Sequence, residues 1–200
     1  LIVASPTQVV MWGANFDDML TYAPYFEKEI MPWVRKASEA MAAAGKLVMC
    51  HTDGENLGLM DLLRESGMDV AEAVCPAPMT KVTIQEYYRR WSPKLTLFGG
   101  VPSTVVLPET SEANFEAFMD EMFRAVAPGT RMVCGIADQV PPNAIFSRLQ
   151  RIGERVEREP IRGLGQSPQW DPGAKQLVGV QRAKPPEAAE DLVLKLVIFA

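Results

Sequence analysis

Polar and acidic side chains cluster at three points where an apolar strand is expected to end and a helix to begin. The clusters are Asn15-Phe16-Asp17-Asp18, His51-Thr52-Asp53-Gly54-Glu55 and Gly135-Ile136-Ala137-Asp138. Because a (β/α) barrel takes its catalytic groups from the carboxyl ends of several strands, the clusters predict one active site. The candidates for catalysis are Asp17, His51, Asp53, Glu55 and Asp138.

His51 is the single histidine of the chain. Asp53 and Glu55 follow it at a spacing of two, which places all three side chains on one side if strand geometry persists. An imidazole in a barrel mouth can bind a metal or transfer protons. The alternative is a histidine that is hydrogen-bonded to a neighbouring loop.

Each carboxylate also has a structural alternative. Asp17 and Asp18 would bind substrate or act as a base, or else cap the helix that follows. Asp138, before Pro141-Pro142, would be catalytic or would fix an Asx-type turn. Glu72 lies inside the apolar segment 69–75, where a buried carboxylate is costly unless it is paired, so we expect a neighbouring cation.

Three further features have two readings each. Gly99-Gly100 stands at a strand end, where the absence of side chains allows either a ligand or neighbouring backbone to approach closely. The pair is therefore a candidate for cofactor binding. Cys134 within a strand is a metal ligand or a small buried apolar residue. Trp12 and Trp33 are expected in the core.

Five short apolar segments alternate with helical patterns. Strands are expected at 8–14, 46–50, 69–75, 95–98 and 131–136, and helices at 22–44, 57–66, 84–91, from Ser111 onward, and at 144–156. Apolar strands of this kind are typical of parallel strands covered on both faces, in a doubly wound sheet or a (β/α)₈ barrel. No Gly-x-Gly-x-x-Gly follows the first strand, which disfavours a dinucleotide-binding fold.

Five βα units are three short of a closed barrel, and the chain opens inside an apolar segment. We therefore expect an incomplete barrel over 1–159, as a piece of a longer protein. Residues 160–200, rich in Gly, Pro and Gln, are expected to form an irregular tail. Within this tail, the segment 192–199 is apolar enough for a strand or a short helix, and we assign it to neither.

Composition limits the partners. A net charge of −5 argues against nucleic acid. No run approaches the ~18 apolar residues that a membrane span requires. Three cysteines in or beside apolar strands favour reduced thiols in a cytoplasmic protein. The expected partner is a small-molecule substrate, and open sheet edges leave a homodimer open.

Four phrases, in this order and spacing, carry a family resemblance. They are Pro24-Tyr25-Phe26 with Ile30-Met31-Pro32-Trp33, then His51-Thr52-Asp53-Gly54, then Gly99-Gly100-Val101-Pro102-Ser103, and Gly135-Ile136-Ala137-Asp138 before Pro141-Pro142. With them, residues 9–156 resemble the uroporphyrinogen decarboxylase superfamily. The resemblance implies a (β/α)₈ TIM barrel, of which this chain would supply strands four to eight.

The resemblance implies two activities. One is decarboxylation of a carboxylated, tetrapyrrole-like substrate, as in porphyrin biosynthesis, with no cofactor required and with acid groups that protonate the carbanion. The other is methyl transfer between a corrinoid protein and a thiol. In that branch a His-x-Cys pair and a later Cys hold zinc, and the matching residues here are His51, Asp53 and Cys134, which zinc accepts. A third hypothesis is an inactive truncated fragment.

Overall fold

A computed structural model describes residues 1–13, 15–127, 131–158, 169–171 and 176–178. Its centre is a parallel five-stranded sheet in the order β1-β2-β3-β4-β5. The strands are β1 Val9–Met11, β2 Leu47–His51, β3 Val70–Val74, β4 Thr96–Val101 and β5 Met132–Ile136. The predicted parallel α/β sheet is confirmed, and each strand pairs with the next one in the chain.

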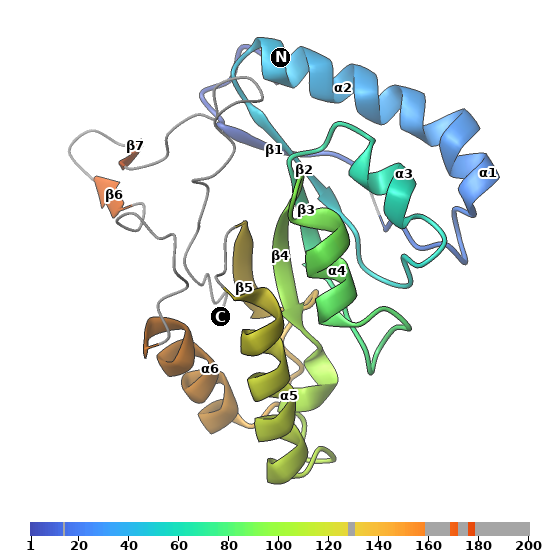
Figure 1. Cartoon of the computed structure of the whole chain (residues 1–200). Coiled ribbons are helices and arrows are strands. Elements are labelled where there is room, and N and C mark those ends of the chain that lie inside the picture. The colour runs from blue at the N-terminus through green and yellow to red at the C-terminus, as the bar shows by residue number, and fades with distance from the viewer. Residues whose placement is uncertain (14, 128–130, 159–168, 172–175, 179–200) are drawn as a thin grey trace.

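The helices run alongside this sheet (Figure 1). They are α1 Ala23–Tyr25, the π-helix η1 Phe26–Ile30, α2 Met31–Ala43, α3 Met60–Arg64, α4 Ile84–Trp91, the 3-10 helix η2 Ser103–Val106, α5 Glu112–Val126 and α6 Phe146–Arg158. Helix α3 contacts α4, and α4 contacts α5. Right-handed crossovers between strands added in one direction leave their helices on one face, which explains this row.

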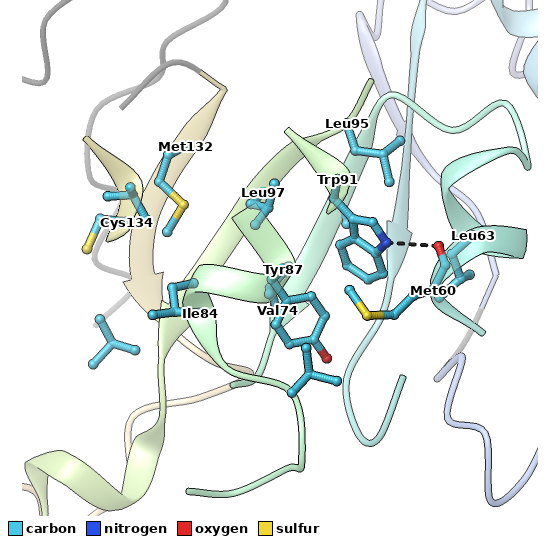
Figure 2. Close-up of a cluster of buried hydrophobic side chains, with 14 of the residues drawn as sticks. Met60, Leu63, Val74, Ile84, Tyr87, Trp91, Leu95, Leu97, Met132 and Cys134 are labelled. Carbon is cyan, nitrogen blue, oxygen red and sulfur yellow. Dashed lines mark hydrogen bonds between the residues drawn. The ribbon is translucent and has the colours of Figure 1, made fainter. Parts of the chain in front are cut away.

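The core lies between the helix row and the sheet (Figure 2). Trp91 and Tyr87 of α4 are fully buried, with ring centroids 4.8 Å apart. The Trp91 indole Nε1 donates a hydrogen bond of 2.9 Å to the carbonyl of Met60 in α3. Burial of a large side chain of this kind contributes about 2–3 kcal/mol, so these two aromatics fix α3 and α4 against the strands.

Local sequence explains where two helices begin. The Thr83 hydroxyl accepts a hydrogen bond of 3.2 Å from the amide of Glu86, and the Ser111 hydroxyl accepts one of 3.2 Å from the amide of Asn114. Both side chains satisfy amides that a helix leaves without an intrahelical partner. Thr83 and Ser111 are therefore the N-caps of α4 and α5.

The expected helix at 22–44 is interrupted. A π-helical turn, η1, separates α1 from α2, and Pro32 lies in the first turn of α2. Proline has no amide hydrogen to bond the preceding turn, and this favours the wider turn before it. The expectation that Trp12 and Trp33 are core residues is wrong, because they are 40% and 63% exposed. Trp12 follows β1, which is the first strand in the order of the five-stranded sheet.

Helix α6 is joined to the rest of the fold by a buried arginine. Arg148 donates to the carbonyls of Val105, Leu107 and Thr110 at 3.1, 2.6 and 2.6 Å. It also pairs with Glu112 of α5 at 2.6 Å. All three nitrogens of the guanidinium have acceptors, which makes the burial of its charge tolerable.

Of the tail expected at 160–200, the structure describes two short strands. They are β6 Gln169–Asp171 and β7 Gln176–Val178, which form an antiparallel pair. The apolar segment 192–199 lies outside the described residues. Among the helices of the described ranges, none combines the length and the apolar character needed to cross a bilayer.

Candidate functional site

The two faces of the sheet differ in chemistry. Side chains alternate between faces along a strand. In β2, Val48 and Cys50 belong to the core beneath the helices, so His51 lies on the opposite face. Glu72 of β3 is the register partner of His51 and lies on that same face. The open face of the sheet therefore carries the ionisable groups.

His51 and Glu72 form a close pair. The distance from Nδ1 of His51 to Oε2 of Glu72 is 2.6 Å, and the two side chains are 21% and 16% exposed. Glu72 was expected to pair with a cation, and the partner that the structure gives it is the imidazole of His51. Because a carboxylate can only accept, Nδ1 carries the proton, and the lone pair of a neutral ring is then on Nε2.

Asp138 and Asp53 complete a group around His51. One ligand atom from each of the three residues lies within 4.8 Å of the others, and Nε2 of His51 is 3.9 Å from Oδ1 of Asp138. His51 ends β2, and Asp138 follows β5, with β3 and β4 between them. Three of the predicted catalytic residues are thus brought together.

The surroundings of Asp53 change the pKa of its carboxyl group. Burial raises the pKa of its carboxyl group, and the negative charge of Asp138 raises it further, against the amide of Gly54 and the imidazole of His51, which lower it. A carboxyl group whose pKa is raised keeps its proton to higher pH, so it is available there as a general acid.

The other two predicted catalytic residues, Asp17 and Glu55, have their oxygens occupied by backbone amides. Asp17 accepts from Met19 and Glu55 at 2.6 and 2.9 Å. Glu55 accepts from Leu57 and Lys81 at 3.0 and 2.8 Å. Each carboxylate holds one loop against another, so we assign both to positioning. The capping alternative for Asp17 is wrong, because the N-cap of α1 is Tyr22 and receives no side-chain hydrogen bond.

Asp18 and Asn56 fasten the same loops. Asp18 accepts from the amide of Gly58 at 2.7 Å. Buried Asn56 donates to the carbonyl of Phe16 at 2.6 Å and accepts from the Tyr87 hydroxyl at 2.8 Å. The loop that carries Asp53 is therefore fixed to the loop after β1 and to α4. Asn56 was missed by the sequence reasoning, since nothing in one sequence distinguishes its buried amide from an exposed one.

Cys134 differs from the expectation for a metal ligand. It belongs to the core cluster on the helix side of β5 and appears beside Met132 in Figure 2. Burial raises the pKa of its thiol to about 12, which disfavours the thiolate that metals bind. The group around His51 contains Asp138 and not Cys134.

Gly99 and Gly100 face protein atoms. A Cβ on Gly99 would lie 2.9 Å from both the nitrogen and the oxygen of Val74, and one on Gly100 would lie 2.5 Å from Cε of Met132. Both glycines have positive φ, 123° and 86°. Of the two readings of this pair, the close approach of backbone and core side chains is the one that the contacts support. Cofactor binding by these residues remains a prediction.

A separate apolar groove of about 300 Å³ lies beside η1 and α2. Its lining includes Trp12, Phe16, Glu29, Ile30 and Trp33. None of the predicted site residues lines it. The groove lies next to the edge strand and contributes no group to the His51 cluster.

Comparison of the chain with protein-family models, with curated proteins and with solved structures gives no match. The geometry of the described residues therefore supplies the whole argument for the site.

Proposed function

We propose that the sheet is the strand-four-to-eight part of a (β/α)₈ barrel. Two observations support this. The strand order is sequential, without the reversal that marks a doubly wound sheet. In addition, neighbouring strands lie about 4.8 Å apart, so β2 and β5 would be about 14 Å apart in a flat sheet. Nε2 of His51 and Oδ1 of Asp138 are 3.9 Å apart, and a sheet that curls toward the face opposite the helices would bring them this close.

The function that this geometry supports best is metal-dependent catalysis on a small molecule. The observation that carries the proposal is the convergence of the ligand atoms of His51, Asp53 and Asp138 within 4.8 Å of one another. One nitrogen and two oxygen donors fit zinc, and the carboxylates also suit Mn²⁺ or Mg²⁺. Within the resemblance, this favours the zinc-dependent methyltransferase branch, with Asp138 in place of Cys134.

Charge supports the same choice. The described rim contains the carboxyl groups of Asp17, Asp18, Asp53, Glu55, Glu72 and Asp138, with His51 between them. Such a rim attracts cations and repels a substrate with several carboxylates. It is complementary to a divalent ion and less suited to a tetrapyrrole-like polyanion.

In this proposal the chain's own groups have separate tasks. His51, Asp53 and Asp138 hold the metal, which would supply Lewis acidity and lower the pKa of a bound thiol or water. Glu72 orients the His51 ring. Asp17 and Glu55 keep the loop of Asp53 in place. A corrinoid protein as methyl donor follows from the resemblance alone.

A second candidate is decarboxylation, which the raised pKa of Asp53 favours. A carboxyl group that stays protonated to higher pH could protonate the carbon that loses carbon dioxide. This reaction would need no metal. An inactive fragment is the third outcome, and it predicts neither turnover nor ligand binding.

Zinc binding separates these candidates. We expect the purified chain to bind one Zn²⁺ in calorimetry, and we expect Asp138→Asn to weaken binding strongly while Cys134→Ala leaves it unchanged. Glu39→Gln, a change of an exposed carboxylate on α2, is the matched control. If zinc binding were lost in Cys134→Ala and kept in Asp138→Asn, the ligands would instead be His51, Asp53 and Cys134, as the resemblance implies. No zinc binding by the wild type would reject the metal-dependent proposal.

A further inference from the structure

We propose that Glu72 is a positioning residue that fixes His51 with Nε2 turned toward the rim, and that a bulge in β3, accommodated by Gly99, keeps the side chain of Val74 off the face on which the two residues meet.

The first step is the pair itself. The 2.6 Å contact between Glu72 Oε2 and His51 Nδ1 is partly shielded from water, since both side chains are mostly buried. Hydrogen bonds to a charged group are short and strong. With Nδ1 engaged, the ring cannot flip without losing this bond, and Nε2 stays 3.9 Å from Asp138.

The second step is an irregularity in β3. Ala71 pairs with Leu97 and Val74 pairs with Gly99, so β3 uses three steps where β4 uses two. Ala73 absorbs the extra residue with a φ of +59°, in the left-handed region. As a result, Val74 joins Ala71 in the core instead of sharing a face with Glu72, which lies opposite His51.

The third step is the close contact between the bulge in β3 and Gly99 of the neighbouring strand β4. The backbone of Val74 lies so close to Gly99 that a Cβ there would be 2.9 Å from two of its atoms. A side chain on residue 99 would therefore push the bulge away. Gly99 acts on the site through β3, without touching His51 or its ligand group.

These three features match what is known of functional strands. Bulges are frequent next to active sites, where they redirect side chains. Non-glycine residues in the left-handed region concentrate there too, and Asp138, with a φ of +60°, is a second example in this site. A histidine that binds metal commonly donates its other ring N–H to a carboxylate.

The test uses the fact that the chain has a single histidine. Its imidazole gives one set of ¹⁵N and ¹H resonances, which report the tautomer of the neutral ring in alkaline buffer. We expect the Nδ1–H tautomer in the wild type and a shift toward Nε2–H in Glu72→Ala. Glu72→Gln should retain the wild-type tautomer, because its amide oxygen still accepts. Glu39→Ala is the control and should change nothing.

A wild-type ring in the Nε2–H form, or a Glu72→Ala ring that keeps Nδ1–H, would overturn the proposal. For the bulge, the backbone coupling constant of Ala73 should report a positive φ in the wild type, and an extended value would overturn that part. Folded Gly99→Ala should show mixed tautomers. If that variant does not fold, the coupling constant of Ala73 in the wild type still tests whether the bulge is present.

A zinc titration adds a second readout, and this arm rests on the proposed function. We expect Glu72→Ala to weaken Zn²⁺ binding about 10–100-fold relative to the wild type. Unchanged affinity would contradict the positioning role. Absence of zinc binding in the wild type would reject the proposed function and leave the tautomer experiment to judge Glu72 alone.

Discussion

Nε2 of His51 lies 3.9 Å from Oδ1 of Asp138, although two strands separate the strands that carry these residues. His51 ends β2, and Asp138 lies in the segment that follows β5. The contact therefore joins the carboxyl ends of two strands that are not neighbours in the sheet.

Asp53→Asn is expected to stabilise the fold at neutral pH. The folded state raises the pKa of Asp53 above its ordinary value of 3.8, so it binds more protons than the unfolded chain just above that value. Stability is then lost as pH rises through this window, and at neutral pH the ionised group is unfavourable. The amide removes this cost and should raise Tm by about 1–3 °C near pH 7.

The same substitution should flatten the pH dependence of stability, and thermal unfolding from acid to neutral pH measures both effects. Burial also raises the pKa of Asp69, but that contribution is common to variant and wild type and cancels in their difference. A lower Tm for Asp53→Asn at neutral pH would contradict the repulsion between Asp53 and Asp138.

Arg148→Ala should destabilise the fold by about 2–4 kcal/mol in urea unfolding. The change removes hydrogen bonds to three backbone carbonyls and leaves them short of partners. Arg151→Ala is the matched control, because that guanidinium pairs with Glu112 at an exposed position and should matter by less than about 1 kcal/mol. Equal small losses in both variants would show that the buried guanidinium holds nothing in place.

Ala73→Gly should be close to neutral, within about 0.5 kcal/mol. The φ of +59° at Ala73 costs an alanine about 1–2 kcal/mol, and glycine recovers this while it loses chain entropy. Ala71→Gly in the same strand, with ordinary φ and a buried methyl group, should cost about 1–2 kcal/mol. Chemical denaturation compares the free energies of unfolding of the two variants. Equal losses of stability would argue against a left-handed backbone conformation at Ala73.

Gly99→Ala should cost more than about 2 kcal/mol, because the new Cβ meets the backbone of Val74 at a positive φ. Gly135→Ala is the control: its Cβ would make an ordinary contact of 3.4 Å with the ring of Phe98. That variant should be neutral or slightly stabilised. Free energies of unfolding from urea curves give the difference. A harmless Gly99→Ala would return this glycine to the list of ligand-contact candidates.

The sequence predicted the strands, the helices between them and three members of the site, since apolar runs and polar strand ends are local signals. It did not predict which cluster members face each other. The choice between Asp138 and Cys134 depends on which side of β5 each lies. The positioning role of Asp17 depends on a hydrogen bond from the amide of Glu55, which is distant in sequence. The bulge at Ala73 is likewise fixed by the β3–β4 register.

Asn56 joins the loop after β1 to α4, while Asp17 and Glu55 join the loops after β1, β2 and β3. Because these three loops hold one another in place, a change in the sequence of one loop affects the positions of the other two. A library that randomises one of them would mostly produce misassembled rims, whereas exchanging all three together from a protein of the same fold would preserve their mutual contacts. Changes of specificity in such a protein would then arise in evolution as coordinated replacements.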